Sequence, residues 1–187
     1  MPSPLHLTRA QLDAGLDHIC QAPVDGGALL QIVRRPDVGR REVLDAATLS
    51  LSDGLVWDTW AVRGSHRTLD GSRHPDMQLN VMNARAAALI AQTPERWALA
   101  GDQLYVDLDL SEANLPAGTR LAIGSAVIEV TAEPHTGCGK FVQRFGVDAQ
   151  KFVNAAVGRA LRLRGLNARV VTEGPIRVGD VVRKLPR

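Results

Sequence analysis

The chain has 187 residues, of which 45 % are hydrophobic and 22 % are charged, and its formal net charge is +2. A chain of this length buries about 70 % of its unfolded surface, so one domain can fold without a disulfide or a metal ion. No uncharged run approaches the roughly 20 apolar residues of a membrane span, we expect no signal peptide, and the aromatic content of 4 % disfavours a base-stacking nucleic-acid platform.

Charge is distributed unevenly along the chain. Residues 139–187 carry a net charge of +8, and the rest of the chain carries −6. A basic region on a nearly neutral protein can attract an anionic ligand, although an ordinary solvated surface produces the same pattern. The two cysteines form no C-x-x-C motif, which gives no support to a structural zinc or iron–sulfur site. Two free thiols without a signal peptide favour the cytoplasm.

The first predicted element is a helix over residues 8–21. Thr8 and Gln11 have the spacing of a capping box. Leu12, Ile19 and Cys20 share one face of this helix at a spacing of three to four residues. We therefore expect Cys20 to be a small apolar core residue.

The remaining pattern consists mainly of short strands. Two helices are predicted among them, one over 84–90 with Asn83 as its cap and one over 141–158 with an interruption at Gly146. Residues 119–131 have the pattern of a hairpin with a two-residue turn. The predicted strands are 28–33, 47–51, 77–82, 104–108, 119–123, 126–131, 167–172 and 178–183. Many short strands with scattered helices favour a single, mainly β domain, either a barrel or a sandwich.

Several catalytic motifs are absent. The chain contains no G-x-G-x-x-G, H-E-x-x-H or G-x-S-x-G sequence, and its five histidines have no metal-ligand spacing. The run from Gly137 to Phe141 resembles the end of a phosphate loop. Pro134 stands where the first glycine of that loop belongs, and Phe141 stands where a hydroxyl must reach Mg²⁺, so we reject a phosphate loop.

Cys138 is the most informative residue of the chain. Gly137 and Gly139 flank it with backbone that lets a ligand approach the sulfur closely. A helix is predicted to begin near Phe141, and Lys140 lies two residues away, and both features favour the thiolate. A thiolate binds soft metals, attacks electrophiles or carries sulfane sulfur. These local features are equally compatible with an inert cysteine in a turn.

Several segments between Ile32 and the C-terminus have the order and spacing of a known pattern. Residues 101–104 (GDQL) are similar to a segment G-[ED]-N-L, and residues 116–131 are similar to a hairpin, P-x-G-T-x-[LF]-x-I-G-x-A-x-[LI]-x-V-[ST]. Cys138 then falls at a signature cysteine, and residues 165–171 and 176–182 are similar to a closing pair of strands. From Ile32 to the C-terminus the sequence therefore resembles the MOSC domain family, named after the C-terminal domain of molybdenum cofactor sulfurases.

The sequence departs from the family pattern at two places. Trp57 stands where the early G-[LIV]-x-G-D segment has its second glycine, although Asp58 is kept. The three tryptophans are expected mainly in the core. Cys138 lies in a T-G-C-G context instead of the commoner P-C, which indicates a divergent branch. We expect no pyridoxal-phosphate domain before the match and no ferredoxin-like cysteine cluster after it.

The resemblance implies a barrel-like β fold and, for several members, binding of the molybdenum cofactor (molybdopterin). Cys138 would then be the molybdenum ligand and a catalytic residue, since soft sulfur suits this metal. His135 would be a second catalytic residue, which tunes the thiolate or relays protons. The contacts to the phosphate and polar rings of the cofactor would come from Arg169, Lys140, Asp58 and Asn83. Three further arginines are weaker candidates, namely Arg144, Arg159 and Arg164.

Three functions remain open. The resemblance implies first a reductase of N-hydroxylated compounds that receives electrons from a separate donor protein. The second is a sulfur carrier that holds a persulfide on Cys138 and exchanges sulfur with a donor and an acceptor. The third is a non-catalytic barrel that binds another anion.

Overall fold

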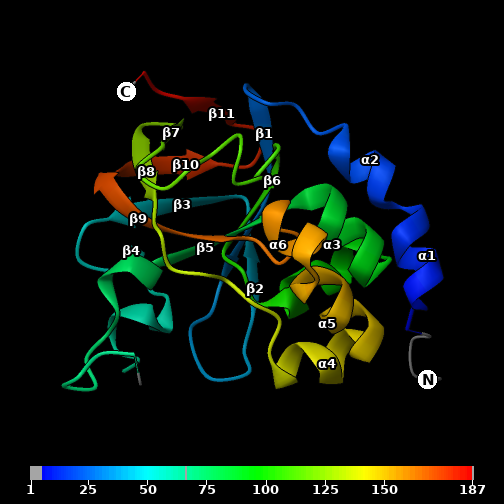
Figure 1. Cartoon of the computed structure of the whole chain (residues 1–187). Coiled ribbons are helices and arrows are strands. Elements are labelled where there is room, and N and C mark those ends of the chain that lie inside the picture. Colours follow the sequence, from blue (N-terminus) through cyan, green and yellow to red (C-terminus); the bar gives the residue numbers. More distant parts are fainter. Residues whose placement is uncertain (1–5, 66, 187) are drawn as a thin grey trace.

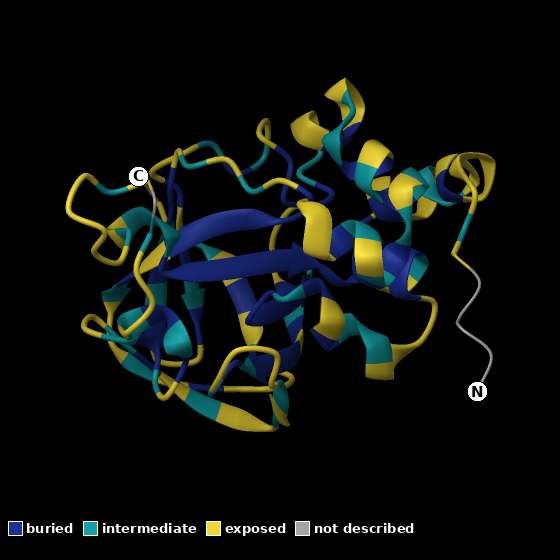
Figure 2. Ribbon diagram, turned by 90° about the horizontal axis from the view of Figure 1, so that it is seen from below, coloured by how far each residue is buried: buried dark blue, intermediate teal, exposed yellow. Residues whose placement is uncertain are grey.

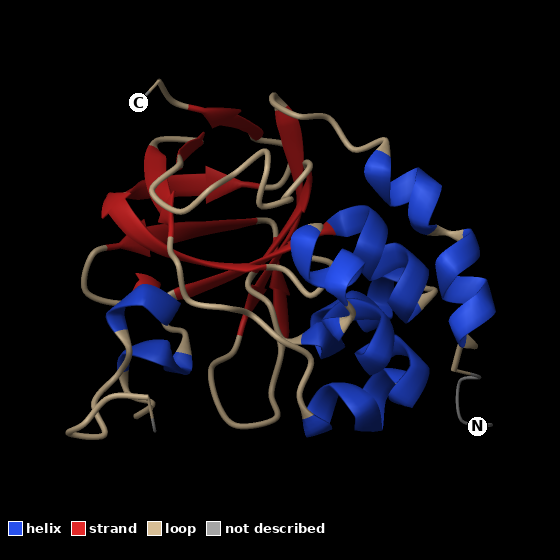
Figure 3. Cartoon of the chain, viewed as in Figure 1, coloured by secondary structure: helices blue, strands red, loops and turns tan. Residues whose placement is uncertain are grey.

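The structure is a computed structural model that describes residues 6–65 and 67–186. Its strands form a barrel, and its longer helices gather on one side of that barrel (Figure 3). Within the described residues, no helix combines the length and the apolar character needed to cross a bilayer.

Seven strands close into a mixed β-barrel, as the sequence predicts (Figure 1). Their order around the barrel is β11-β7-β8-β9-β5-β6-β1, and pairing of β11 with β1 closes it. β5 and β6 run parallel, and the other neighbouring pairs are antiparallel. The barrel strands are β1 (Gly27–Arg34), β5 (Leu79–Asn83), β6 (Leu104–Asp107), β7 (Arg120–Ile123), β8 (Ala126–Val130), β9 (Leu166–Thr172) and β11 (Val181–Lys184).

Four further strands and three short 3-10 segments lie outside the closed barrel. β2 (Glu42–Leu44) extends β1, and a second sheet has the order β10 (Gly174–Arg177), β3 (Ala46–Ser50) and β4 (Gly54–Leu55). The 3-10 segments are η1 (Thr59–Ala61), η2 (Pro75–Met77) and η3 (Pro94–Ala100). The predicted strand over 178–183 begins only at Val181, and β2, β4 and β10 were not predicted.

The helical layer packs against the barrel wall that contains β5 and β6. Its helices are α1 (Arg9–Ala14), α2 (Leu16–Cys20), α3 (Ala84–Ala91), α4 (Gly139–Phe145), α5 (Val147–Asn154) and α6 (Ala156–Ala160). Asn83 caps α3 as predicted, because its side-chain oxygen accepts hydrogen bonds from the backbone N–H groups of Arg85 and Ala86. The predicted helix over 141–158 is three helices, which are separated at Gly146 and Ala155.

Alternating side chains of β5 and β6 join two hydrophobic cores. Leu104 and Val106 point into the barrel, and Tyr105 between them points into the helical layer. Val81 and Met82 divide in the same way on β5, as the two-residue period of a strand requires. These strands are therefore covered on both faces and appear as a buried centre in Figure 2.

The N-terminal prediction is correct in its cap and wrong in its extent. The capping box of Thr8 and Gln11 is present, and Leu12 and Ile19 are buried. The helix ends at Ala14, however, and α2 restarts after Gly15. Cys20 is exposed, which contradicts its predicted core position. The break changes which residues of the last turn face the core, so that a continuous 3.6-residue period no longer applies.

Trp57 adopts a conformation that bulky residues rarely take. Its φ is +68°, the left-handed region in which glycine is favoured. The motif that residues 54–58 resemble has a glycine at this position, and glycine takes a positive φ without strain. Its side chain is 77 % exposed, so Trp57 is not the core residue that we predicted, whereas Trp60 is buried.

Candidate functional site

A cavity of about 580 Å³ lies beside Cys138. Its walls come from the loop after β1, from η1 and the segment that follows it, from the turn before β6 and from the chain around the start of α4. Basic side chains dominate the lining, namely Arg35, Arg41, Arg63, Arg67, Lys140, Arg144 and Arg164. The arrangement therefore favours an anionic ligand.

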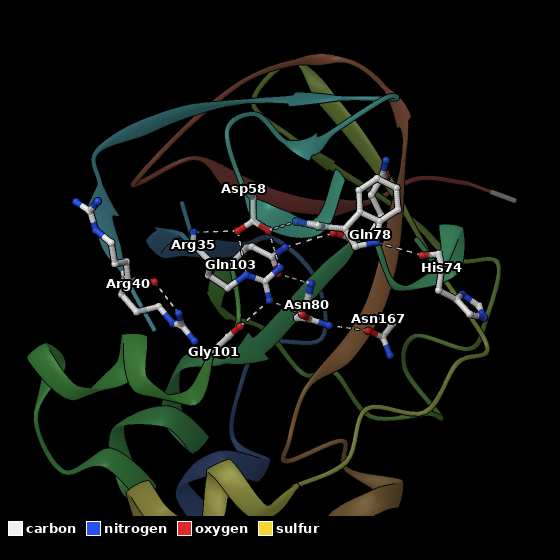
Figure 4. A network of polar contacts seen from close by, with 11 residues as sticks. Arg35, Arg40, Asp58, His74, Gln78, Asn80, Gly101, Gln103 and Asn167 are labelled. Atoms are coloured by element: carbon white, nitrogen blue, oxygen red, sulfur yellow. Dashed lines mark hydrogen bonds and ion pairs between the residues drawn. The ribbon is translucent and has the colours of Figure 1, made fainter. Parts of the chain in front are cut away.

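Arg35 forms part of the cavity wall and is held by a buried carboxylate. Its Nη2 donates to Asp58 Oδ1 at 2.8 Å, and its Nε donates to Asp58 Oδ2 at 2.9 Å. Its Nη1 donates to Asn80 Oδ1 at 3.0 Å and to the carbonyl of Gly101 at 2.9 Å (Figure 4). Two parallel bonds of this kind fix the plane of a guanidinium group. Asp58 thus orients Arg35 and does not itself line the cavity.

Beside Arg35, a chain of amide side chains runs from Gln103 through Asn80 on β5 to Asn167 on β9, on the face of these strands that points away from the barrel core (Figure 4). Asn80 Nδ2 donates to Asn167 Oδ1 at 2.6 Å, and the Asn80 N–H donates to Gln103 Oε1 at 2.8 Å. Gln103 in turn donates to the carbonyl of Gln78 at 3.3 Å. Because each amide has a partner, this network can remain buried, and it gives the cavity a rigid floor.

Arg164 and Asp102 form a second buried ion pair beside the cavity. Arg164 Nη1 lies 2.6 Å from Asp102 Oδ2, and Nη2 donates to the carbonyl of Ala100 at 2.8 Å. The guanidinium carbon also lies 5.1 Å from the centre of the Phe141 ring, a cation–π arrangement. Arg164 is therefore fixed beside the first turn of α4, next to Cys138.

His135 adjoins this pair and also lines the cavity. Its Nδ1 lies 3.4 Å from Asp102 Oδ1. Burial, followed by the charges of Arg164 and Arg35, holds the pKa of His135 well below its usual range. His135 is therefore neutral near pH 7. Its proton belongs on Nδ1, because otherwise the lone pairs of Nδ1 and Oδ1 would face each other.

Cys138 is the N-cap of α4 and is exposed at the cavity. Partial burial raises the pKa of its thiol, but the nearby backbone N–H groups of Phe141 and Lys140 and the charge of Arg164 outweigh that effect. The net result is a lowered pKa, which increases the population of the thiolate.

The loop before Cys138 is held by α5. The N–H of Gly137 donates to Asn154 Oδ1 at 2.9 Å, and Asn154 Nδ2 donates to the carbonyl of Gly137 at 3.0 Å. Gln150 adds a longer bond of 3.3 Å to the same carbonyl. A Cβ on Gly137 would lie 3.0 Å from Val153, so glycine permits this close approach, whereas a Cβ on Gly139 would meet open space.

The cavity has more positive than negative charge. Three ion pairs neutralise some of its basic side chains, namely Arg35–Asp58, Arg164–Asp102 and Arg67–Glu133. Among the described residues, no ion pair involves the remaining four, which are Arg41, Arg63, Lys140 and Arg144. Burial first, and the neighbouring arginines second, lower the pKa of Arg41 and Arg63. Asp37 is the one acidic side chain among the described lining residues.

The structure brings together some of the predicted site residues and separates others. Cys138, His135 and Lys140 line the cavity. Arg169 does not line it, because this side chain is on β9, where it pairs with Glu129 at 2.6 Å and with Asp76 at 3.2 Å.

Asn83 also lies away from the cavity lining. It is buried, it caps α3, and its Nδ2 donates to the carbonyl of Leu108 at 2.8 Å. Both polar atoms of its side chain therefore have structural partners in this fold. Of the weaker candidates, Arg144 and Arg164 line the cavity, and Arg159 lines a separate small cavity of about 100 Å³.

Sequence reasoning missed the arginines that come from the first half of the chain. Arg35 and Arg41 flank the loop Pro36–Arg40, and Arg63 and Arg67 follow η1. The two arginine pairs 34–35 and 40–41 around a Pro- and Gly-containing loop were an available signal. The charge balance obscured it, because residues 1–138 carry a net charge of −6.

The donor set does not form a metal site by itself. Among the residues that the structure describes, no group of three or more His, Cys, Asp or Glu side chains is placed to hold a metal ion. Cys138 is therefore a single soft donor beside a cationic cavity.

Comparison with known proteins connects this geometry to a family. The family model of the MOSC domain matches residues 72–183. This match begins at residue 72, whereas the resemblance in the sequence was placed from Ile32 onward. No protein of the curated collection matches the chain.

Several solved structures have a similar fold. The YuaD protein from Bacillus subtilis has a TM-score of 0.60 and 18 % identity, over 83 % of this chain and 93 % of that chain. YiiM from Escherichia coli has a TM-score of 0.55 and 21 % identity, over 86 % of this chain and 70 % of that chain. YiiM from Geobacillus stearothermophilus has a TM-score of 0.53 and 15 % identity, over 88 % and 74 %. At such identities, the likeness shows a shared fold.

Proposed function

Because the chain belongs to the MOSC domain family, we propose that its cavity binds the molybdenum cofactor and that the Cys138 thiolate is the protein ligand of the metal. One observation supports this most strongly: Cys138 opens onto a cavity that is lined by seven basic side chains. A thiolate is a suitable ligand for a soft metal, and arginine forks suit a phosphate group.

The residues present fit such a cofactor in two respects. First, two buried donors of arginines that line the cavity, Arg41 Nε and Arg164 Nε, have no hydrogen-bond partner among the described residues. Unpaired buried polar groups are costly, so they indicate a missing partner. Second, the unneutralised cations call for an anion.

The chemistry that we propose is reduction of an N-hydroxylated compound. When bound, the cofactor would supply transfer of two electrons, by which R–NH–OH, two electrons and two protons give R–NH₂ and water. A separate donor protein would deliver the electrons. Cys138 would anchor the cofactor, and Arg35 and Arg164 would hold its anionic groups. Neutral His135, with its proton held on Nδ1 toward Asp102, would leave Nε2 as a hydrogen-bond acceptor for the ligand, and Lys140 would supply a proton at the mouth.

A second candidate is a sulfur carrier, which the exposure of Cys138 favours. In this case the thiolate would hold a persulfide and pass its outer sulfur to an acceptor. The lowered pKa of Cys138 suits both candidates, so loss of activity in Cys138→Ser would not separate them. Metal content separates them.

The test is a measurement of molybdenum and pterin per chain in protein purified from a cofactor-competent host. Wild type should contain both at near-equimolar amounts. Cys138→Ala should lose them and remain folded, because its side chain is exposed. Cys20→Ala is the matched control, since it removes the other exposed thiol of the chain, and it should retain both.

Three other results would decide against this assignment. Full occupancy in Cys138→Ala would exclude Cys138 as the essential ligand. An added sulfur atom on Cys138, seen by intact-protein mass spectrometry without metal, would support the carrier. If the protein contains neither metal nor persulfide in a host proven to make the cofactor, the function that remains is that of an anion-binding barrel.

A further inference from the structure

We propose that Arg41 and Arg144 together form a binding subsite for a phosphomonoester group at one end of the cationic cavity. This inference rests on the proposed function and adds the residues that hold the phosphate. It replaces Arg169, which the sequence suggested for this role and which lies outside the cavity in two ion pairs.

The two guanidinium groups both approach Gly101. Arg41 Nη2 lies 3.8 Å, and Arg144 Nη1 lies 3.9 Å, from the position that a Cβ on Gly101 would occupy. Both nitrogens are thus near the same point of the cavity wall. The positive charge of Arg144 disfavours the charged form of Arg41, and an anion that binds both would offset this repulsion.

Backbone carbonyls position these arginines without neutralising them. Arg41 Nη1 donates to the carbonyl of Arg40 at 2.6 Å, and Arg144 Nη1 donates to the carbonyl of Leu99. Among the described residues, neither side chain is in an ion pair with a carboxylate. The buried Nε of Arg41 has no partner there either. N–H donors of both guanidinium groups therefore remain available to a ligand.

Burial is the main cause of the lowered pKa of Arg41, and the charges of Arg144 and Arg35 add to it. The positive charges at this place therefore oppose one another in the free protein. A phosphomonoester is a dianion near neutral pH and accepts bidentate bonds from guanidinium groups. It matches both the charge and the donor geometry of this pair.

The position of the pair also restricts the ligand. Arg144 is in the last turn of α4, and Cys138 caps the start of that helix. Six residues of helix separate them by about 9 Å along the axis. A ligand with a phosphate at one end and a sulfur-seeking group at the other could contact both of these residues. Either the side chain of the cofactor or a phosphorylated substrate has this chemistry.

The experiment is a calorimetric titration of the full, cofactor-free chain with inorganic phosphate. Arg41→Gln and Arg144→Gln should each raise the dissociation constant about tenfold, because each removes one charge-assisted contact. Arg144→Lys should have an intermediate effect, since it keeps the charge but loses the fork. Circular dichroism and thermal melts would verify that each variant is folded.

Two arginines outside the cavity serve as matched controls. Arg40→Gln changes the residue next to Arg41, whose side chain is 3.9 Å from Glu42, and Arg169→Gln changes an arginine in surface ion pairs. Both should bind phosphate like wild type. Unchanged binding in Arg41→Gln and Arg144→Gln, or an equal loss in the two controls, would overturn the proposal.

Cofactor-loaded protein distinguishes the source of the phosphate. If the cofactor fills the subsite, loaded wild type will no longer bind inorganic phosphate there. If loaded protein still binds it in an Arg41-dependent manner, the subsite serves a phosphorylated substrate. Phosphate binding that depends on both arginines in a protein that never acquires molybdenum would support the subsite and reject the proposed cofactor.

Discussion

His135 shows how one largely enclosed residue can link the site to stability. Its side chain lies between Asp102 and a group of arginines, and burial together with Arg164 and Arg35 lowers its pKa in the folded protein. In the unfolded chain a histidine titrates near its ordinary value of about 6.5. As the pH falls below that value, the unfolded state binds a proton that the folded state does not. Stability conferred by neutral His135 is thus complete above the unfolded pKa and decreases below it.

We therefore expect the free energy of unfolding of wild type to fall more steeply with acid than that of His135→Gln. Between about pH 7.5 and about pH 5.5 the additional loss should be about 1 kcal/mol. Urea unfolding at both pH values measures it, and the other histidines are common to both proteins. Parallel pH profiles for the two proteins would show that His135 is protonated as easily in the fold as outside it.

At the scale of elements, the contact between α5 and the loop before α4 positions the thiol. Asn154 binds both the N–H and the carbonyl of Gly137, one residue before Cys138. These two bonds cross between segments that are 17 residues apart in sequence. They hold the turn in which backbone N–H groups approach the sulfur, so the loop depends on α5 for its shape.

Asn154→Ala should lower the free energy of unfolding by about 1–3 kcal/mol, because it leaves the Gly137 peptide without its partners. It should also shift the pH midpoint of Cys138 alkylation by iodoacetamide upward, in a Cys20→Ala background. Gln150→Ala is the control, since it removes only the 3.3 Å bond to the same carbonyl and should change both quantities less. Equal effects of the two substitutions would refute a specific role for Asn154.

An element could be predicted from the sequence where its pattern is local, and could not where its formation depends on distant partners. Residues 28–33 and 104–108 have a buried strand pattern of their own, and both were found in the structure as β1 and β6. β2, β4 and β10 were missed because two to four residues have too little periodicity, and their existence depends on partners distant in sequence. The helix break falls at Gly15, a residue that weakens a helix locally, and glycine also lets Leu89 pack closely there, because a Cβ would lie 2.6 Å from that side chain.

At the scale of the whole molecule, the cavity is assembled from segments that are far apart in the sequence. Its walls come from segments around residues 35–41, 59–67, 77–80, 100–101, 134–144 and 164. Local pattern identified Cys138, because its flanking glycines and nearby helix are adjacent in sequence. It could not identify Arg35 or Arg41, whose place opposite Cys138 is determined by the strands that carry them. Resemblance to the family supplied the order of the motifs but favoured Arg169 over the arginines of the cavity.

The most direct test of the central claim is alkylation of the two cysteines in cofactor-loaded and cofactor-free protein, followed by peptide mass spectrometry. Both thiols are exposed, so Cys20 is an internal reference within each sample. We predict that loading protects Cys138 from iodoacetamide and leaves the rate at Cys20 unchanged. A protein that contains molybdenum and yet is alkylated at Cys138 as fast as the cofactor-free form would contradict the assignment of Cys138 as the ligand.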